Sequence, residues 1–285
     1  MISSLPFNKR YRILPLCFIC LQLSAQNMPD SVVLRIHYTS QMRYYEDSKD
    51  LSPDEKILDI GKYASHFYSR WAERNRDIYD SVFSRGGKLE DYYAAIDKSG
   101  FPNSRTRFNV FKNYPQKNKL TYTSDRLRDF IYEEPMVMPK WEMLSGDTTI
   151  VGYPCKKAKT AFRGRTWIVW YAMDIPYHDG PWKLYGLPGL VLKANDSKGD
   201  FIFNCIGIEK GKNQAIVLRK TKYIKCTPKT LEENERLAAK DIDLFIVKMG
   251  YPKLQGFDPQ GKPIVRKPNI PCLLEYRLKD ESEGF

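Results

Sequence analysis

Histidine is the residue type best suited to acid–base chemistry, and this chain contains three. His178 precedes Asp179 in a loop-like segment, and an imidazole beside a carboxylate is a pair that could move a proton. One His-Asp dipeptide is a weak signal, and His37 and His66 lie in predicted strands, where a histidine is more often packed than bound to metal. No nucleophile elbow, P-loop, dinucleotide fingerprint or HExxH motif accompanies them. The sequence therefore predicts no catalytic residue, no metal site, no cofactor and no enzyme.

Four cysteines are the next group with chemistry of their own: Cys155, Cys205, Cys226 and Cys272. An even number of cysteines in an oxidising compartment predicts two disulfides, and sequence does not choose among the three pairings. One disulfide with two free thiols is an alternative. A metal site is a weaker alternative, because structural zinc sites use closely spaced pairs and these four are separated by 50, 21 and 46 positions.

Aromatic residues between positions 167 and 185 are the main candidates for binding a ligand. The residues that we assign to this role are Tyr177, Trp182, Tyr185, Trp170 and Tyr171. Aromatic rings beside basic side chains suit sugar rings, lipid head groups or a peptide of a partner protein. Packing in the core is the competing explanation, and it fits the strand residues Trp170 and Tyr171 better than the loop residues.

A proline between two glycines follows these aromatics, in the stretch Tyr185-Gly186-Leu187-Pro188-Gly189-Leu190-Val191. Pro188 and Gly189 fit the central positions of a type II turn, because proline holds φ at about −65° and glycine accepts a positive φ. The motif Gly186, Leu187, Pro188, Gly189 and Leu190 is therefore predicted to be structural: a turn that leads into a strand and needs no ligand.

The elements that position these residues begin after an N-terminal leader. Basic residues at positions 9, 10 and 12 precede an apolar run from Ile13 to Leu23, and small residues follow up to Ala25. This three-part pattern predicts a signal peptide over 1–25, export, and a location in the periplasm, at the outer membrane or outside the cell. No later apolar run is longer, and one of about a dozen residues is too short to cross a bilayer as a helix.

The composition is strongly basic, with 46 Lys and Arg against 34 Asp and Glu and a net charge of +12. Removal of the leader takes away three basic residues and no acidic one, which leaves an excess of nine. An exported protein meets anionic lipid head groups and acidic glycans far more often than nucleic acid. We expect no nucleic-acid partner. Two interpretations of the basic charge remain: a peripheral contact with an anionic membrane surface, or a solvated surface that binds nothing specific.

The mature chain is predicted to form one β-rich domain over 26–250 and an extended tail over 251–285, because no linker or repeat interrupts it. Apolar patterning predicts strands over 32–38, 57–60, 63–68, 107–111, 119–123, 130–132, 148–151, 155–162, 166–173, 190–194, 201–208 and 215–221. Such short strands favour a curved antiparallel sheet or half-barrel meander. Short helices are predicted from Arg70 to Phe83 and from Leu89 to Ile96.

A longer helix is predicted over 228–249. Thr227 and Pro228 fit the N-cap and first helical position, and Gly250 fits the end. The apolar residues that recur at helical spacing are Ala238, Ile242, Phe245, Ile246 and Met249. We expect this face to pack on the sheet, so the predicted fold class is mainly β (α+β) with one long C-terminal helix.

Several segments together resemble the GLPGLI family, secreted proteins of Bacteroidota-type bacteria. Besides the proline-containing turn, the resemblance is carried by Leu58-Asp59-Ile60-Gly61-Lys62, Gly152-Tyr153-Pro154-Cys155, Trp170-Tyr171-Ala172 and Ile175-Pro176. These segments occur in order between Val32 and Ile208, and Val191 stands where the family name has isoleucine. The resemblance implies a secreted, envelope-associated, β-rich protein. It carries no catalytic residue across, because the family has no assigned activity.

Three functions of different classes remain open. The leading hypothesis is a non-enzymatic binding or carrier module for an apolar or anionic envelope ligand or partner. The alternative is a structural or assembly subunit of an outer-membrane receptor or transport complex. The second alternative is a hydrolase that uses His178 with Asp179 or a free cysteine. Sequence identifies neither the ligand nor the oligomeric state.

Overall fold

The computed structural model describes residues 30–253 except 103, 105, 126 and 127, together with 262, 264 and 267–275. The predicted leader over 1–25 and most of the predicted tail over 251–285 lie outside the described residues. Within the described part, no helix is long and apolar enough to cross a membrane.

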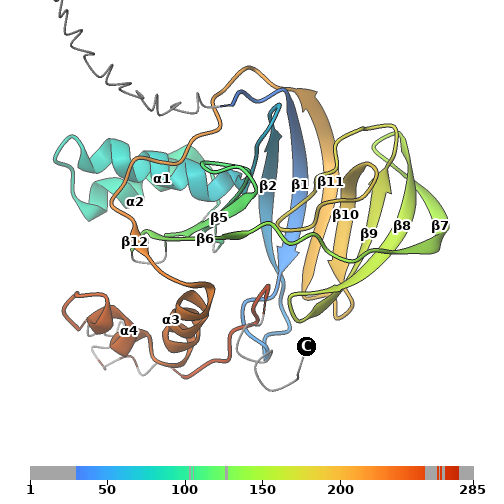
Figure 1. Cartoon of the computed structure of the whole chain (residues 1–285). Coiled ribbons are helices and arrows are strands. Elements are labelled where there is room, and N and C mark those ends of the chain that lie inside the picture. Colours follow the sequence, from blue (N-terminus) through green and yellow to red (C-terminus); the bar gives the residue numbers. More distant parts are fainter. Residues whose placement is uncertain are drawn as a thin grey trace, which may run out of the picture.

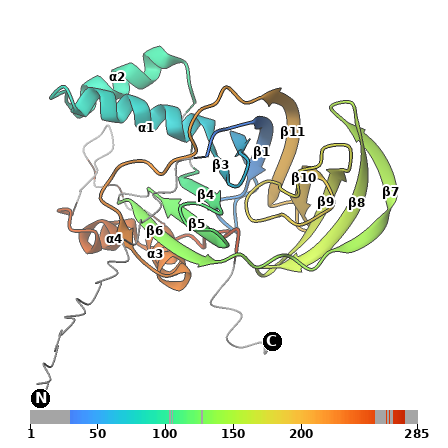
Figure 2. The same ribbon diagram turned by 45° about the horizontal axis from the view of Figure 1, so that its top comes forward.

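Twelve strands of the described residues form one sheet, which curls around its concave face without closing (Figures 1 and 2). The first half comprises β1 (Leu34–Met42), β2 (Ser52–Ile60), β3 (Ser65–Ser69), β4 (Phe108–Lys112), β5 (Lys119–Ser124) and β6 (Phe130–Pro135). The second comprises β7 (Glu142–Ile150), β8 (Tyr153–Phe162), β9 (Arg165–Ala172), β10 (Leu190–Asp196), β11 (Phe201–Lys210) and the short β12 (Ile224–Lys225). These strands confirm the predicted β-rich α+β class.

The sheet consists of two antiparallel meanders that meet where β1 pairs with β11, in the order β12-β6-β5-β4-β3-β2-β1-β11-β10-β9-β8-β7. Only the two-residue pairing of β12 with β6 is parallel among the described strands. The predicted hairpin around Gly61 and Lys62 is present, since β2 and β3 pair from Ile60 opposite Ser65 onwards. Antiparallel neighbours can be joined by short connections, which is why local sequence patterns predicted an antiparallel meander. They did not predict the pairing of β1 with β11.

Four helices lie among the described residues: α1 (Arg70–Phe83), α2 (Leu89–Ser99), α3 (Pro228–Lys240) and α4 (Ile242–Lys248). The first two are inserted between β3 and β4, close to where they were predicted. The Ser69 hydroxyl caps α1 by accepting from the Ala72 N–H at 3.0 Å. Thr227 caps α3 in the same way, with its Oγ1 3.1 Å from the Thr230 nitrogen.

The expectation of one helix over 228–249 is wrong, because the chain breaks at Asp241. This residue has an extended backbone with φ of −149° and ψ of 90°, and its carboxylate accepts from the Leu244 N–H at 2.9 Å. Asp241 therefore ends α3 and caps α4. The two helices pack on each other, and Leu231 of α3 packs beside Phe130 and Tyr132 at the β6 edge rather than across the sheet.

The predicted strand over 215–221 is also wrong. The chain makes a single isolated bridge, between Ser31 and Ala215, and then leaves the sheet. Arg219 explains the departure: its guanidinium binds three carboxylates on α1, those of Glu73, Asp77 and Asp80, at 2.7–2.8 Å. Ion pairing with a helix draws this segment away from strand pairing.

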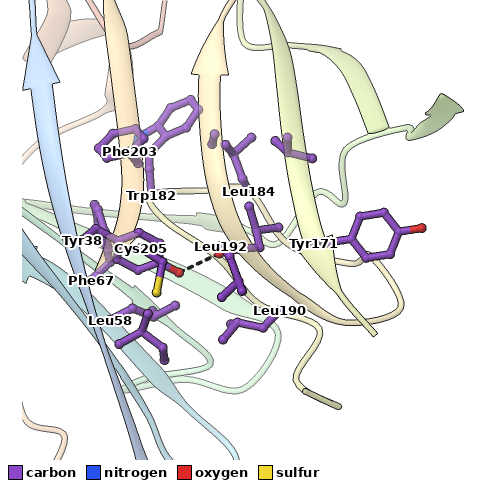
Figure 3. Close-up of a cluster of buried hydrophobic side chains, with 14 of the residues drawn as sticks. Tyr38, Leu58, Phe67, Tyr171, Trp182, Leu184, Leu190, Leu192, Phe203 and Cys205 are labelled. Atoms are coloured by element: carbon purple, nitrogen blue, oxygen red, sulfur yellow. Dashed lines mark hydrogen bonds between the residues drawn. The ribbon is translucent and has the colours of Figure 1, made fainter. Parts of the chain in front are cut away.

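The concave face of the sheet is filled by the protein itself. The loop 173–189 between β9 and β10 folds into the curl and places Trp182 and Leu184 there, both with 0 % exposure (Figure 3). The Trp182 ring lies 5.4 Å from that of Trp167 on β9 and 6.0 Å from that of Phe162 on β8. Around Trp182 and Leu184, the interior of the curled sheet is therefore packed with side chains and holds no ligand cavity.

Candidate functional site

The proline-containing motif holds the loop 173–189 in the sheet. Its turn is not the predicted type II turn: the Gly189 N–H bonds to the Leu187 carbonyl at 2.8 Å, while the Leu190 N–H bonds to Ile175 at 3.2 Å. These bonds make a tighter three-residue turn around Pro188. Gly189 has a φ of +153°, and a Cβ there would lie 2.2 Å from the Ala172 carbonyl oxygen. Glycine is required by this close approach of two backbones.

Burial corrects the proposed aromatic ligand site. Trp182 is fully buried and Tyr171 is 4 % exposed, so neither offers a ring face to a ligand. Tyr177 and Tyr185 are half-buried around the same loop. Trp170 is also half-buried, but it lies on the opposite, outer face of the sheet. The structure therefore splits this sequence cluster between the core and two surfaces.

The His178–Asp179 dipeptide does not form a catalytic pair. The Asp179 carboxylate binds the buried Lys112 ammonium and its own neighbour, the Gly180 N–H, while His178 is exposed. Lys112 also donates to the Gly180 carbonyl at 2.8 Å. Asp179 thus anchors the loop 173–189 to β4.

The other two histidines sit in strands, as expected. His66 is stacked between Tyr68 and Phe111, and desolvation by burial lowers its pKa. His37 lies between the carboxylates of Glu55 and Glu209. Among the described residues, no group of three His, Cys, Asp or Glu side chains is arranged to hold a metal ion.

The four cysteines expected to form disulfides are free thiols in this structure. Cys155, Cys205 and Cys272 contribute to the main core, and Cys272 also accepts a hydrogen bond from the Arg165 guanidinium. Cys226 donates to the Ile131 carbonyl. Burial raises the pKa of every one of these thiols, to about 11 for Cys205 and Cys272. A thiol that stays protonated is a poor nucleophile, so none has the activation of a catalytic cysteine.

A cavity of about 710 Å³ lies at one end of the curled sheet, where β1 and β5 end and β4 and β11 begin. Five tyrosines from three parts of the chain line it, and we call it the tyrosine cavity: Tyr44, Tyr45, Tyr92, Tyr93 and Tyr122. Apolar side chains share the lining, among them Met42, Phe108, Phe201 and Leu231. Rings and apolar groups are thus combined with hydroxyls in one hollow.

Secondary elements hold these tyrosines in different ways. Tyr92 and Tyr93 project from α2, Tyr122 lies on β5, and Tyr44 and Tyr45 follow the end of β1. The Tyr44 hydroxyl bonds to Thr106 Oγ1 at 2.8 Å. Desolvation by burial raises the pKa of both Tyr92 and Tyr122, so their hydroxyls remain protonated at neutral pH. Each can then donate as well as accept a hydrogen bond.

A C-terminal strap, residues 271–275, closes one side of the tyrosine cavity. The Cys272 N–H donates to the Tyr44 carbonyl at 2.9 Å, and Arg165 Nε donates to the Leu273 carbonyl at 2.8 Å. Farther along the strap, the Glu275 carboxylate accepts from the buried Lys183 ammonium at 2.8 Å. The cavity therefore depends on contacts between segments that lie far apart in the chain, 92 positions in the case of Lys183 with Glu275 and 108 in the case of Arg165 with Leu273.

Sequence reasoning missed the tyrosine cavity, because its residues are scattered over the chain. The one available signal was a pair of tyrosine doublets, Tyr44-Tyr45 and Tyr92-Tyr93. The second doublet occurs in a predicted surface helix, where two adjacent rings cannot both face the protein. Tyr93 is indeed 55 % exposed.

The fold and this site define a mainly β protein built on one open, strongly curved sheet that carries a tyrosine-lined cavity at its end. Comparison with known proteins finds a similarity over part of the chain. A family model described as "N-glycanase peptide, N-terminal domain" matches residues 108–238, slightly less than half of the chain. No curated protein matches the sequence.

Two solved structures of PNGF-II, in different crystal forms, are similar to this chain at 15 % sequence identity, with TM-scores of 0.48 and 0.49. The alignments cover 72 % of this chain and 34 % of PNGF-II. The chain thus spans about one third of the length of those proteins.

Proposed function

We propose that this chain is a non-enzymatic carbohydrate-binding module of the cell envelope that holds a glycan in the tyrosine cavity. The observation that carries the proposal is the convergence of five tyrosines on one cavity. Its volume of about 710 Å³ lies in the range of small-molecule sites, roughly 300–1,000 Å³. Tyrosine supplies a ring for the apolar face of a sugar and a hydroxyl for its polar edge.

The apolar part of the lining favours sugars that carry an N-acetyl group. Phe108, Phe201 and Leu231 present no hydrogen-bonding group on their side chains, so they suit the methyl of an acetamido substituent. The likeness of residues 108–238 to an N-glycanase domain supports the choice of a glycan as the ligand. Six residues of that matched segment line the cavity: Phe108, Tyr122, Ser124, Phe201, Leu231 and Glu235.

Binding is favoured over hydrolysis by the charges in the cavity. Among the lining residues that the structure describes, Glu235 is the one carboxylate. Hydrolysis of a glycosidic bond ordinarily uses two carboxylic residues on either side of the bond. The export signal and the resemblance to the GLPGLI family remain predictions that are consistent with an envelope protein.

Titration calorimetry with N,N′-diacetylchitobiose tests the proposal. Tyr93→Ala should weaken binding by about fivefold, the equivalent of roughly 1 kcal/mol for a lost aromatic contact. Tyr63→Ala is the matched control, because Tyr63 is 69 % exposed at the β2–β3 turn and lies outside the cavity. Maltose, which lacks acetamido groups, should bind more weakly. Equal affinities for both variants, or no binding of chitobiose by the unmodified protein, would refute the proposal.

A further inference from the structure

A second hollow lies on the outer face of the sheet. It has a volume of about 670 Å³ and is lined by side chains of β1, β2, β10 and β11, with Trp71 of α1 among them. We call it the outer groove. Its lining has no residue in common with the tyrosine cavity. The two sites are therefore separate.

Strand register arranges the polar residues of the outer groove into a cross-strand row. Thr39 of β1 lies opposite Asn204 of β11, and Asn204 lies opposite Lys193 of β10. The row continues to Trp170 of β9 and Lys157 of β8. Residues in register share a face, and adjacent strands are about 4.8 Å apart. Polar groups thus recur at short intervals across five strands.

A parallel row adds two further amides beside Asn204. Gln41 of β1 lies opposite Ile202 of β11, which lies opposite Asn195 of β10. Gln41, Asn195 and Asn204 all line the outer groove. Amides donate and accept, so this floor can bond to ligand hydroxyls of either orientation.

Lys193 makes the groove positive on its β10 side, and Trp170 and Lys157 continue the same row beyond the lining. Lys193 and Lys157 lie over the Trp170 ring, with ammonium groups 5.0 and 5.3 Å from its centroid. Neither has a carboxylate partner within ion-pair distance among the described residues, whereas the neighbouring Lys156 binds Asp147 at 2.8 Å. Glu55, at the other end of the row, is compensated by Arg70 at 2.8 Å.

We propose that the outer groove binds an acidic oligosaccharide, with a sugar carboxylate at the Lys193 ammonium and the hydroxyls of adjoining sugars on the amide floor. Trp71 supplies an aromatic ring in the lining. A peptide that adds as a strand needs a free sheet edge, and the four strands of the groove are all interior to the sheet. A lysine inside a hollow fits one carboxylate better than it fits an extended anionic membrane surface.

Calorimetry with trigalacturonic acid tests this inference, and its fully methyl-esterified form is the matched uncharged ligand. The acid should bind more tightly than the ester, and its affinity should fall as salt concentration rises. Lys193→Gln should weaken binding of the acid by about two- to fivefold, the effect of one exposed ion pair. Lys156→Gln is the control that should leave affinity unchanged. Asn204→Ala should weaken binding of both ligands, because it removes a hydrogen-bonding group from the floor.

Equal affinity for acid and ester, or an unchanged affinity in Lys193→Gln, would overturn the inference. Sedimentation with phosphatidylglycerol vesicles tests for a membrane contact instead. If the protein binds the vesicles but not trigalacturonic acid, and Lys193→Gln abolishes vesicle binding, the groove binds a membrane surface and the inference of a sugar site is overturned. The outcome is independent of the tyrosine cavity. Lys193→Gln should retain chitobiose binding, and chitobiose should not displace trigalacturonic acid.

Discussion

Replacement of Trp182 by alanine tests the conclusion that the loop 173–189 forms part of the core. Trp182 is fully buried in the concave face (Figure 3). Its ring contacts those of Trp167 and Phe162. Its backbone has a positive φ of 53°. Alanine at this position would have the same backbone strain, so the change isolates the contribution of the ring.

Two estimates give the size of the effect. Large-to-alanine changes at buried tryptophan or phenylalanine cost about 3–5 kcal/mol. Burial of roughly 150–250 Å² at about 25 cal/mol per Å² corresponds to about 4–6 kcal/mol, part of which alanine retains. We therefore expect a loss of about 4 kcal/mol in the free energy of unfolding. For a domain of this size, that loss lowers Tm by about 8–16 °C.

Urea denaturation followed by circular dichroism measures this loss. Trp71→Ala is the control, because Trp71 is half-exposed on α1, and it should cost less than about 1.5 kcal/mol. Added indole should restore part of the stability of Trp182→Ala by filling the vacated apolar space. A loss below about 1 kcal/mol, or no response to indole, would mean that the loop detaches easily and that the packed interior is wrongly assigned.

Two further predictions concern the motif and a buried histidine. Gly189→Ala should lower the free energy of unfolding by about 1–3 kcal/mol, because the new Cβ would meet the Ala172 carbonyl. Gly207→Ala is the control and should be nearly neutral in the same urea titration, because a Cβ at Gly207 would have no atom within 4 Å. Burial lowers the pKa of His66 below its usual 6.5, so the unfolded chain binds more protons just below that pH. The stability that depends on His66 should be fully present above pH 6.5 and should be lost as the pH drops below it. The slope of unfolding free energy against pH should decrease in His66→Phe and persist in the control His178→Phe, because His178 is exposed. Equal slopes in the two variants would contradict this assignment.

Local patterns predicted the elements that depend on near neighbours. The hairpin of β2 and β3, the helix α1 and the cap at Thr227 follow from turn residues and capping side chains a few positions apart. The break at Asp241 escaped prediction, because an apolar repeat continues through it. Its capping hydrogen bond outweighs continuity of the helix.

The candidate site was less predictable than the fold, because it depends on distant contacts. The cluster from Trp170 to Tyr185 is continuous in sequence, yet the sheet buries Trp182 and places Trp170 on its outer face. The tyrosines at positions 44, 92 and 122 meet only after the helices and the C-terminal strap have packed on the sheet.

The sequence alone determined the antiparallel strands, the short helices and the structural character of the glycine-proline turn, since these follow from side-chain periodicity and backbone geometry over a few residues. The tertiary structure decided which aromatics are buried, that Asp179 binds Lys112 instead of serving His178, and where the two hollows lie. The physical reason is that burial and ion pairing arise from the curl of the whole sheet, and that curl brings together residues whose separation along the chain carries no information about their contact.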